Sequence, residues 1–200
     1  MNIINKKLLV ASHNQGKIKE IQDLFQPFGI ELISAATLGI SEPEETGSTF
    51  EENALLKAKF CMNYNTQTPV LADDSGLVIP ALNGAPGIYS ARWAGPDRNF
   101  YNAMDKLEQM LINKPNCQAY FECVLILLMP DFSHKTFVGK WHGKITFPPR
   151  GIYGFGYDPI FIPNGFNITA AEMLPTQKNL LSHRAIAFKQ LVHQVLHNLT

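Results

Sequence analysis

The chain has 200 residues, of which 46% are hydrophobic and 17% charged, and its 17 basic and 17 acidic side chains give a formal net charge of zero. A chain of this length buries roughly 70% of its surface on folding, enough for a core that needs neither disulfides nor a structural metal. A neutral chain lacks the broad positive field that duplex nucleic acid or an anionic membrane requires. The longest strongly apolar run, residues 124–129, is far shorter than the ~20 residues of a membrane span.

The cysteines and the absence of repeats or long linkers further limit the class of protein. Cys61, Cys117 and Cys123 cannot all pair and have no spacing typical of metal ligands, so reduced thiols in a cytoplasmic protein are expected. The apolar stretch at 8–11 is too short for a signal sequence and predicts a strand instead. Because no repeat, low-complexity tract or long linker interrupts the chain, a single domain over residues 1–200 is expected.

The hydrophobic pattern predicts alternating strands and helices. Short apolar runs predict strands at 8–11, 30–34, 70–72, 77–79, 118–129, 135–141 and 144–147. Helical spacing predicts helices over 17–28, 49–64, 99–111 and from 182 onward. Thr49 and Glu52 have capping-box spacing, and Ser182 is a suitable N-cap. The apolar face of the last helix is predicted to hold Ile186, Leu191, Val192, Val195, Leu196 and Leu199. This order indicates an α/β fold, and the consecutive strands in 118–147 favour a mixed sheet.

Polar residues join the first predicted strand to the first predicted helix. They are Ser12, His13, Asn14, Gln15, Gly16 and Lys17. Free N–H groups at a helix start bind anions, the helix dipole favours negative charge, and Lys17 adds a point charge. The segment is not a Walker A loop, because the GxxxxGK(S/T) pattern is absent. It predicts a phosphate-binding turn, with an ordinary Asn-capped turn as the alternative.

Two adjacent carboxylates, Asp73 and Asp74, follow the predicted strand at 70–72. Burying both is costly unless they bind a metal or transfer protons. Since neighbours on a strand point to opposite faces, one of the two is expected to face a ligand and the other to brace the turn. An Asx turn that includes Gly76 is the alternative.

An acidic loop with Glu44, Glu45 and Gly47 precedes the second predicted helix. Asn53 and Lys57 on that helix are four residues apart and share a face. Carboxylates from two chain segments suit Mg²⁺, which keeps several waters and bridges to substrate phosphates. A solvated acidic loop without function is the alternative.

Two later segments suit a nucleotide. Residues 154–159 combine glycines, which let the backbone approach a ligand closely, with aromatics that can stack on a flat ring, although a tight turn packed on the core would have the same composition. His183 and Arg184 oppose the helix dipole in the first turn of the last helix, which indicates a ligand with acceptor oxygens, and Lys178 lies just upstream. His193 and His197 lack the glutamate of a zinc HExxH motif and are expected to face solvent.

Together, and in this order, these segments resemble the inosine triphosphate pyrophosphatase family, in its bacterial branch that acts on dITP and XTP. The matching stretches are SHNQGK at 12–17, EETG at 44–47, FEENALLKA at 50–58, ADDSGL at 72–77, GAPGIYSAR at 84–92, FGYDPIF at 155–161 and QKNLLSHR at 177–184. The resemblance implies Mg²⁺-dependent hydrolysis of ITP, dITP and XTP to the monophosphate and pyrophosphate, by a homodimer that cleanses the nucleotide pool. It also implies a long central mixed sheet flanked by helices, with an active-site cleft between two lobes.

The resemblance also implies roles for individual residues. Asp74 would be the catalytic carboxylate and a metal ligand, Glu45 the second metal carboxylate, and Ser75 a substrate contact. Residues 12–17 would bind the triphosphate. The base and sugar would be held by Phe155, Gly156, Tyr157, Asp158, Lys178, His183 and Arg184. Lys17 and Lys57 can neutralise charge on the pyrophosphate leaving group.

The residues also suggest how the purine base is selected, and two other functions remain as alternatives. Donors from His183 and Arg184 would suit the 6-oxygen of hypoxanthine and xanthine and would leave the amino group of adenine without an acceptor. One rival is a pyrophosphatase for modified pyrimidine triphosphates. The other is a non-catalytic nucleotide-binding module, which would not need both Glu45 and Asp74.

Overall fold

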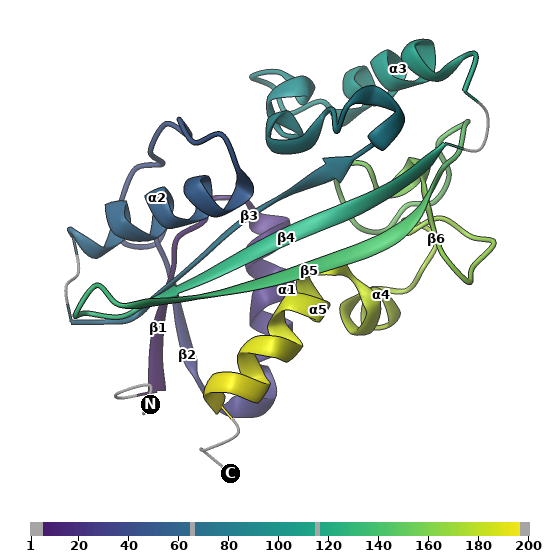
Figure 1. Ribbon diagram of the computed structural model, residues 1–200. Coiled ribbons are helices and arrows are strands. Elements are labelled where there is room, and N and C mark those ends of the chain that lie inside the picture. The colour runs from purple at the N-terminus through teal and green to yellow at the C-terminus, as the bar shows by residue number, and fades with distance from the viewer. Residues whose placement is uncertain (1–5, 65–66, 115–116, 197–200) are drawn as a thin grey trace. The chain divides into compact units, whose positions relative to one another are not determined.

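The structure is a computed structural model that describes residues 6–64, 67–114 and 117–196. Six strands form one sheet in the order β2-β1-β3-β4-β5-β6 (Figure 1). They are β1 (Lys7–Val10), β2 (Glu31–Ser34), β3 (Val70–Val78), β4 (Gln118–Leu128), β5 (His134–Ile145) and β6 (Phe161–Pro163). β1 pairs in parallel with β2 and β3, whereas β5 and β6 are antiparallel. The expected α/β fold with a mixed sheet is confirmed.

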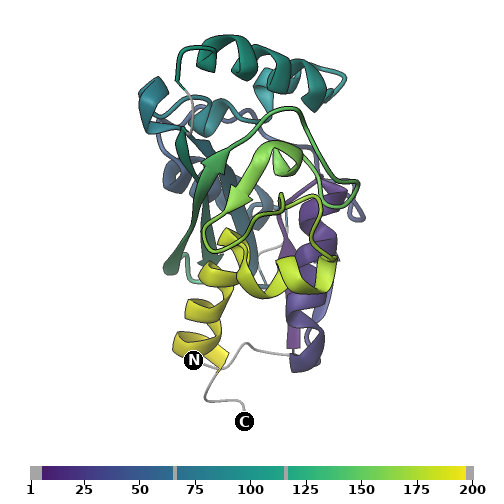
Figure 2. The same ribbon diagram turned by 90° about the vertical axis from the view of Figure 1, so that its right-hand side faces the viewer.

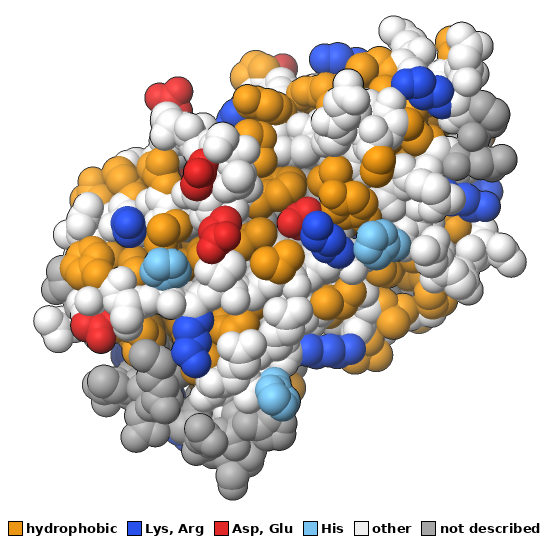
Figure 3. All heavy atoms as spheres, viewed as in Figure 1, with side chains coloured by type: hydrophobic (Ala, Val, Ile, Leu, Met, Phe, Trp, Pro, Cys, Tyr) orange, Lys and Arg blue, Asp and Glu red, His pale blue; other side chains and the backbone are white. Residues whose placement is uncertain are grey.

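The α-helices of the described residues are α1 (Gln15–Phe25), α2 (Phe50–Met62), α3 (Phe100–Leu111), α4 (Pro175–Leu181) and α5 (His183–Leu191). α4 has seven residues, too few to show a helical period in the sequence. Within the described residues, no helix has the length and apolar character that would let it cross a membrane. On the face shown in Figure 3, charged side chains of both signs are interspersed among apolar ones, consistent with the net charge of zero.

The chain divides into two compact units. The first consists of residues 1–74, 123–139 and 184–200, and the second of residues 75–122 and 140–183. β3, β4 and β5 each contribute residues to both units. The expectation of a single domain over the whole chain stays a prediction.

The first unit has its core where α1 and α5 cover one face of the strands. Figures 1 and 2 show these two helices side by side, and the Phe25 and Phe188 rings meet edge to face with centroids 4.7 Å apart. The buried core residues are Leu8, Val10, Ile21, Phe25, Leu71, Cys123, Leu125, Leu127, Met129, Phe137, Ala187, Phe188, Leu191, Val195 and Leu196. Full burial of a large apolar side chain contributes roughly 1.5–3 kcal/mol, so this core holds β1 and β3 firmly against α1.

Two strands continue where the sequence predicted a break. β3 runs through Asp73 and Asp74 without a turn, and the turn prediction was wrong because both carboxylates have cationic partners, one on each face of the strand. β5 runs through Gly143. Gly143 pairs with Pro163, and its missing side chain serves the close approach of β6 rather than a turn.

The end of α1 differs from the prediction. α1 ends at Phe25, earlier than predicted, and Gln26–Phe28 form a 3₁₀ turn that Gly29 closes in a left-handed conformation with φ 61°. Pro27 accounts for the early end, because it cannot donate a hydrogen bond to the α-helical ladder.

The predicted cap of α2 is present in part. Thr49 accepts a hydrogen bond from the Glu52 N–H at 3.1 Å, as predicted. The Glu52 carboxylate accepts from the N–H and the hydroxyl of Ser48, both at 2.7 Å, and thereby ties down the preceding loop.

The predicted last helix consists of α5 and a π-helical turn, Val192–Leu196. Ser182 precedes α5 with the extended backbone of an N-cap position (φ −63°, ψ 161°). Leu199 and His197, which the sequence placed on this helix, lie outside the described residues.

Gly143 provides a test of the contact between β5 and β6. A Cβ at this position would lie 2.3 Å from the Ile162 carbonyl oxygen and 2.7 Å from the Phe161 ring. We expect Gly143→Ala to lower the free energy of unfolding by about 1–3 kcal/mol, because β6 must shift. Urea unfolding followed by tryptophan fluorescence measures this. Lys144→Ala, at the exposed next position, should stay within about 0.5 kcal/mol of the wild type, and equal losses in the two variants would contradict the prediction.

Candidate active site

The segment between β1 and α1 is a tight turn that leads into the helix. The Lys17 N–H donates to Asn14 Oδ1 at 3.1 Å, and the Asn14 N–H donates to Ser12 Oγ at 3.2 Å. Nε2 of His13 lies 2.7 Å from the carbonyl oxygen of Ile40 and donates to it. The first turn of α1 has no acidic residue, so nothing in that turn offsets the positive end of the helix dipole. The segment therefore has the Asn cap that the sequence offered as the alternative, and phosphate binding at this turn stays a prediction.

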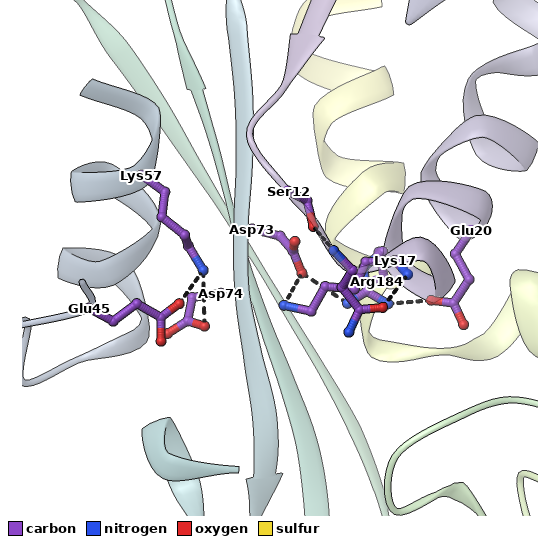
Figure 4. Close-up of polar contacts among 9 residues, drawn as sticks. Ser12, Lys17, Glu20, Glu45, Lys57, Asp73, Asp74 and Arg184 are labelled. Atoms are coloured by element: carbon purple, nitrogen blue, oxygen red, sulfur yellow. Dashed lines mark hydrogen bonds and ion pairs between the residues drawn. The ribbon is translucent and has the colours of Figure 1, made fainter. Parts of the chain in front are cut away.

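Asp73 points to the face of β3 that α1 and α5 cover (Figure 4). Its Oδ2 lies 3.1 Å from Lys17 Nζ and 2.9 Å from Arg184 Nη2. Nη1 of Arg184 also donates to the Glu20 carboxylate on α1. Lys17, Asp73, Arg184 and Glu20 thus form a chain of alternating charges, which we call the α1–α5 ion network. Its centre is inaccessible to solvent, since Asp73 is 2% exposed and Arg184 1%.

Asp74 points to the opposite face of β3, toward α2 (Figure 4). Lys57 Nζ on α2 lies 2.6 Å from Glu45 Oε1 and 3.4 Å from Asp74 Oδ1. Burial by itself would lower the pKa of Lys57, but the charges of Asp74, Asp73 and Glu45 outweigh it and hold this pKa above its usual range. We call these contacts the Glu45–Lys57–Asp74 cluster. The strand alternation expected from the sequence has separated the two aspartates.

The two environments move the pKa values of the aspartates in opposite directions. Burial raises the pKa of Asp74, and the attraction of Lys57 does not fully offset it. Burial would also raise the pKa of Asp73, but Lys17 and Arg184 outweigh it and hold this pKa well below its usual range. Asp73 therefore stays charged, whereas Asp74 is the better proton acceptor of the pair, which suits a general base.

The sequence did not single out Glu20, and it predicted Arg184 at the purine base. Glu20 lies three residues after Lys17 on α1, so the two side chains leave the same side of the helix. That spacing was the only signal in the sequence, and surface ion pairs share it. The structure places the Arg184 guanidinium between the carboxylates of Glu20 and Asp73.

The second unit holds the aromatic and basic residues predicted to contact a base. Asp158 Oδ2 accepts from the Phe155 N–H at 2.9 Å and from Lys178 Nζ at 2.5 Å. Lys178 Nζ also lies 4.6 Å from the centroid of the Phe155 ring. Gly154 (φ 74°) has no room for a side chain, because a Cβ would lie 2.1 Å from Asp158 Oδ2. The loop is therefore built around a buried carboxylate and leaves the Phe155 ring half-buried.

His183 and Tyr157 pack against other parts of the second unit. The His183 ring stacks on Phe121, with centroids 5.0 Å apart and an interplanar angle of 16°. The Tyr157 hydroxyl donates to the Ser90 carbonyl oxygen at 2.9 Å, and its ring meets Phe100 edge to face. Tyr157 thus has the core packing that the sequence offered as the alternative for this loop.

The structure gathers the predicted site residues into two groups. The group in the first unit is Ser12, His13, Asn14, Gln15, Gly16, Lys17, Glu45, Lys57, Asp74 and Arg184. The group in the second unit is Ser75, Phe155, Gly156, Tyr157, Asp158, Lys178 and His183.

A divalent cation suits the donor atoms of the Glu45–Lys57–Asp74 cluster. Among the residues that the structure describes, no group of three or more His, Cys, Asp or Glu side chains is arranged to hold a metal ion. Glu45 and Asp74 nevertheless converge on one cation, the Lys57 ammonium. Mg²⁺ in nucleotide enzymes is usually held by one or two carboxylates together with substrate phosphates. The two carboxylates therefore fit this ion.

Comparison with known proteins places the chain among nucleotide pyrophosphatases. The model of the Ham1 family matches residues 8–194. A protein of Zymomonas mobilis named dITP/XTP pyrophosphatase is 49% identical over 189 residues, which cover 93% of this chain and 90% of that protein. A protein of Rhodospirillum centenum with the same name is 50% identical over 188 residues, with 92% of each chain covered.

Solved structures agree with the fold. A HAM1 protein from Coxiella burnetii superposes with a TM-score of 0.86 at 38% identity, over 96% of this chain and 98% of that one. A structure from Mycobacterium abscessus, named nucleoside-triphosphatase or dITP/XTP pyrophosphatase, gives a TM-score of 0.73 at 38% identity, over 92% and 97% of the two chains.

The opposite pKa shifts of Asp73 and Asp74 predict opposite effects on stability. Asp73→Asn should lower the free energy of unfolding at pH 7 by about 3–5 kcal/mol, because it leaves the buried Arg184 and the half-buried Lys17 without their shared anion. Asp74→Asn should stay within about 1 kcal/mol of the wild type or exceed it, because burial disfavours the charged form that it removes. Urea unfolding of both variants measures this, and a larger loss in Asp74→Asn would contradict it.

The pH dependence of the free energy of unfolding gives an independent check on the role of Asp73. The folded-state pKa of Asp73 lies below its unfolded value, so the stability that its charge contributes is present above the unfolded pKa and is lost as the pH falls toward the folded one. The stability gap between the wild type and Asp73→Asn should therefore be constant near neutrality and start to narrow near pH ~4. A gap that widens in acid would have the wrong sign.

Proposed function

The chain belongs to the Ham1 family, and from this premise we propose that it hydrolyses the non-standard purine nucleoside triphosphates ITP, dITP and XTP to the monophosphate and pyrophosphate. The observation that carries the proposal is the Glu45–Lys57–Asp74 cluster, where two carboxylates converge on one cation. Such an arrangement suits metal-assisted attack on a phosphate. The relatives named dITP/XTP pyrophosphatase support the choice of substrate.

In this proposal, the triphosphate is bound by residues 12–17 and by Lys57. The start of α1 offers backbone N–H groups, the Ser12 hydroxyl and the Lys17 ammonium. The Lys17 side chain is 15% exposed, so its ammonium can serve both Asp73 and a phosphate oxygen. Lys17 and Lys57 neutralise the charge that develops on the pyrophosphate leaving group.

Glu45 and Asp74 are the residues that hold Mg²⁺ in this proposal. Bound Mg²⁺ would polarise a phosphate oxygen and make a coordinated water easier to deprotonate. Asp74 accepts the proton of the attacking water, which its raised pKa favours. Glu45 would supply the second carboxylate to Mg²⁺ while it keeps its ion pair with Lys57.

The second unit is proposed to recognise the base. The Phe155 ring offers a surface for stacking, and Lys178 and His183 offer donors to the 6-oxygen of hypoxanthine or xanthine. Ser75, Gly156, Tyr157 and Asp158 complete the proposed substrate contacts. The 6-amino group of adenine would find donors where it needs an acceptor, which disfavours ATP.

Arg184, which the resemblance places at the base, is proposed to brace the phosphate site instead. Both of its terminal nitrogens donate to carboxylates, one to Glu20 and one to Asp73. By holding Asp73 it fixes the anion to which Lys17 is paired. Arg184→Ala is therefore a poor probe of base selection, because it would unbalance a buried ion network.

A panel of triphosphates tests the function against its two rivals. Release of pyrophosphate from ITP, dITP and XTP, with little from GTP, ATP or dUTP, supports the proposal. Preferential release from pyrimidine triphosphates indicates the rival pyrophosphatase. Binding without turnover in Mg²⁺ indicates the non-catalytic module, and release of single phosphate would exclude cleavage between the α and β phosphates.

We further propose that the protein is a cytoplasmic homodimer. The compartment rests on three cysteines that are all free thiols, and the dimer rests on the family resemblance. Sedimentation at micromolar concentration should give twice the chain mass of 22.4 kDa, and a single-chain mass under these conditions would contradict the dimer.

Asp74→Asn tests the general base. We expect kcat for ITP to fall by about 10²–10⁴-fold with little change in nucleotide affinity, because the amide keeps the shape and loses the charge and basicity. Asp105→Asn, an exposed substitution on α3, is the control and should leave kcat unchanged. Turnover near the wild-type rate by Asp74→Asn in Mg²⁺ would remove Asp74 from the proposed mechanism.

His183→Ala tests base selection at a residue that is not a member of the α1–α5 ion network. If the ring donates to the 6-oxygen, kcat/KM for ITP and XTP should fall roughly tenfold more than for ATP, the worth of one lost hydrogen bond. The measurement is kcat/KM for all three nucleotides in both proteins. A uniform fall would assign His183 to packing against Phe121 alone.

A further inference from the structure

We infer that Asn53 is a positioning residue that sets the place of Glu45 through the main chain of Gly47. The inference rests on the proposed role of Glu45 as a metal carboxylate. It concerns how the acidic loop is attached to α2, a contact made entirely within the first unit.

Asn53 is fully buried on α2 and makes one specific hydrogen bond. Its Oδ1 accepts from the Gly47 N–H at 2.8 Å. Its Nδ2 is also buried and has no hydrogen-bond partner among the described residues. A buried amide with an unsatisfied donor costs about 1–3 kcal/mol, which an apolar residue of similar size would not incur. Packing alone therefore does not explain an asparagine at this position. The hydrogen bond that its Oδ1 accepts from Gly47 does.

The Gly47 backbone lies directly against α2 at this point. A Cβ on Gly47 would lie 2.7 Å from Asn53 Oδ1, 2.7 Å from Glu52 Cβ and 3.0 Å from the Asn53 backbone nitrogen. Only glycine lets the loop approach so closely, so the hydrogen bond fixes the loop main chain at short range.

This anchor lies next to the carboxylate that the proposed function needs. Glu45 is two residues before Gly47, and Lys57, its partner at 2.6 Å, is four residues after Asn53 on the same face of α2. One helix face thus carries both the attachment of the loop and the cation that Glu45 meets. A ligand on a surface loop binds a metal well only when its loop is held in place, because ordering the loop otherwise opposes binding.

The test uses Mn²⁺ as the probe, with its binding measured by electron paramagnetic resonance and no nucleotide present. Asn53→Ala and Asn53→Leu remove the acceptor oxygen in two different ways, so that one packing defect cannot decide the result. Asn53→Asp keeps an acceptor for Gly47. Asn63→Ala, at the exposed end of the same helix, is the matched control. Amide hydrogen exchange at Gly47 reports whether the anchor is intact.

We expect Asn53→Ala and Asn53→Leu to speed exchange at Gly47 and to weaken Mn²⁺ binding by about 3- to 10-fold, the worth of one net hydrogen bond. Asn53→Asp should retain the protection of Gly47, and Asn63→Ala should change neither readout. In a Glu45→Gln background, Asn53→Ala should cause no further loss of Mn²⁺ affinity, because it acts through Glu45.

Three results would overturn the inference. Faster exchange at Gly47 with unchanged Mn²⁺ affinity would make Asn53 a loop anchor without influence on the metal site. An additive loss in the Glu45→Gln background would show that Asn53 acts by another route. If Glu45→Gln by itself leaves Mn²⁺ binding unchanged, the proposed metal site fails, and the inference fails with it for that separate reason.

Discussion

The alternation of side chains along β3 is the constraint on which the site depends. Asp73 and Asp74 are neighbours in the chain and both are buried, and two carboxylates with one set of partners could not both stay charged there. The strand sends them to opposite faces, where each meets its own cations. Asp73 thereby stabilises the first unit, whereas Asp74 is the residue proposed to act as the general base. The pKa of Asp73 is lowered and that of Asp74 is raised.

The α1–α5 ion network connects Lys17, a residue of the proposed phosphate site, to the core of the first unit. Arg184 links Glu20 and Asp73, which are 164 and 111 residues away in the chain. The Phe25 and Phe188 rings hold the same two helices together through apolar contact. Core packing thus sets the distance between α1 and α5. At that distance Arg184 reaches both Glu20 and Asp73, and Asp73 is the anion with which Lys17 is paired.

Two buried groups on the α2 side of the site are less favourable for stability than apolar replacements would be. Burial opposes the charged form of Asp74, and Asn53 keeps one buried donor without a hydrogen-bond partner in the described structure. Departures from optimal stability of this kind concentrate where function needs a particular group. Asp74 is one of the two carboxylates proposed to hold the metal, and Asn53 is bonded to the loop that carries the other.

The sequence by itself determined what depends on near neighbours: the α/β order, the Thr49 cap, the Asn14 turn and the opposite faces of Asp73 and Asp74. Periods of 3.6 and 2.0 and capping rules act over a few residues, so they can be read along the chain. Only the tertiary structure decided that β3 continues through its two aspartates and that the Arg184 guanidinium lies between the carboxylates of Glu20 and Asp73. The physical reason is that local turn signals are weak, whereas a buried charge with a partner from a distant segment outweighs them, and such partners are set by packing.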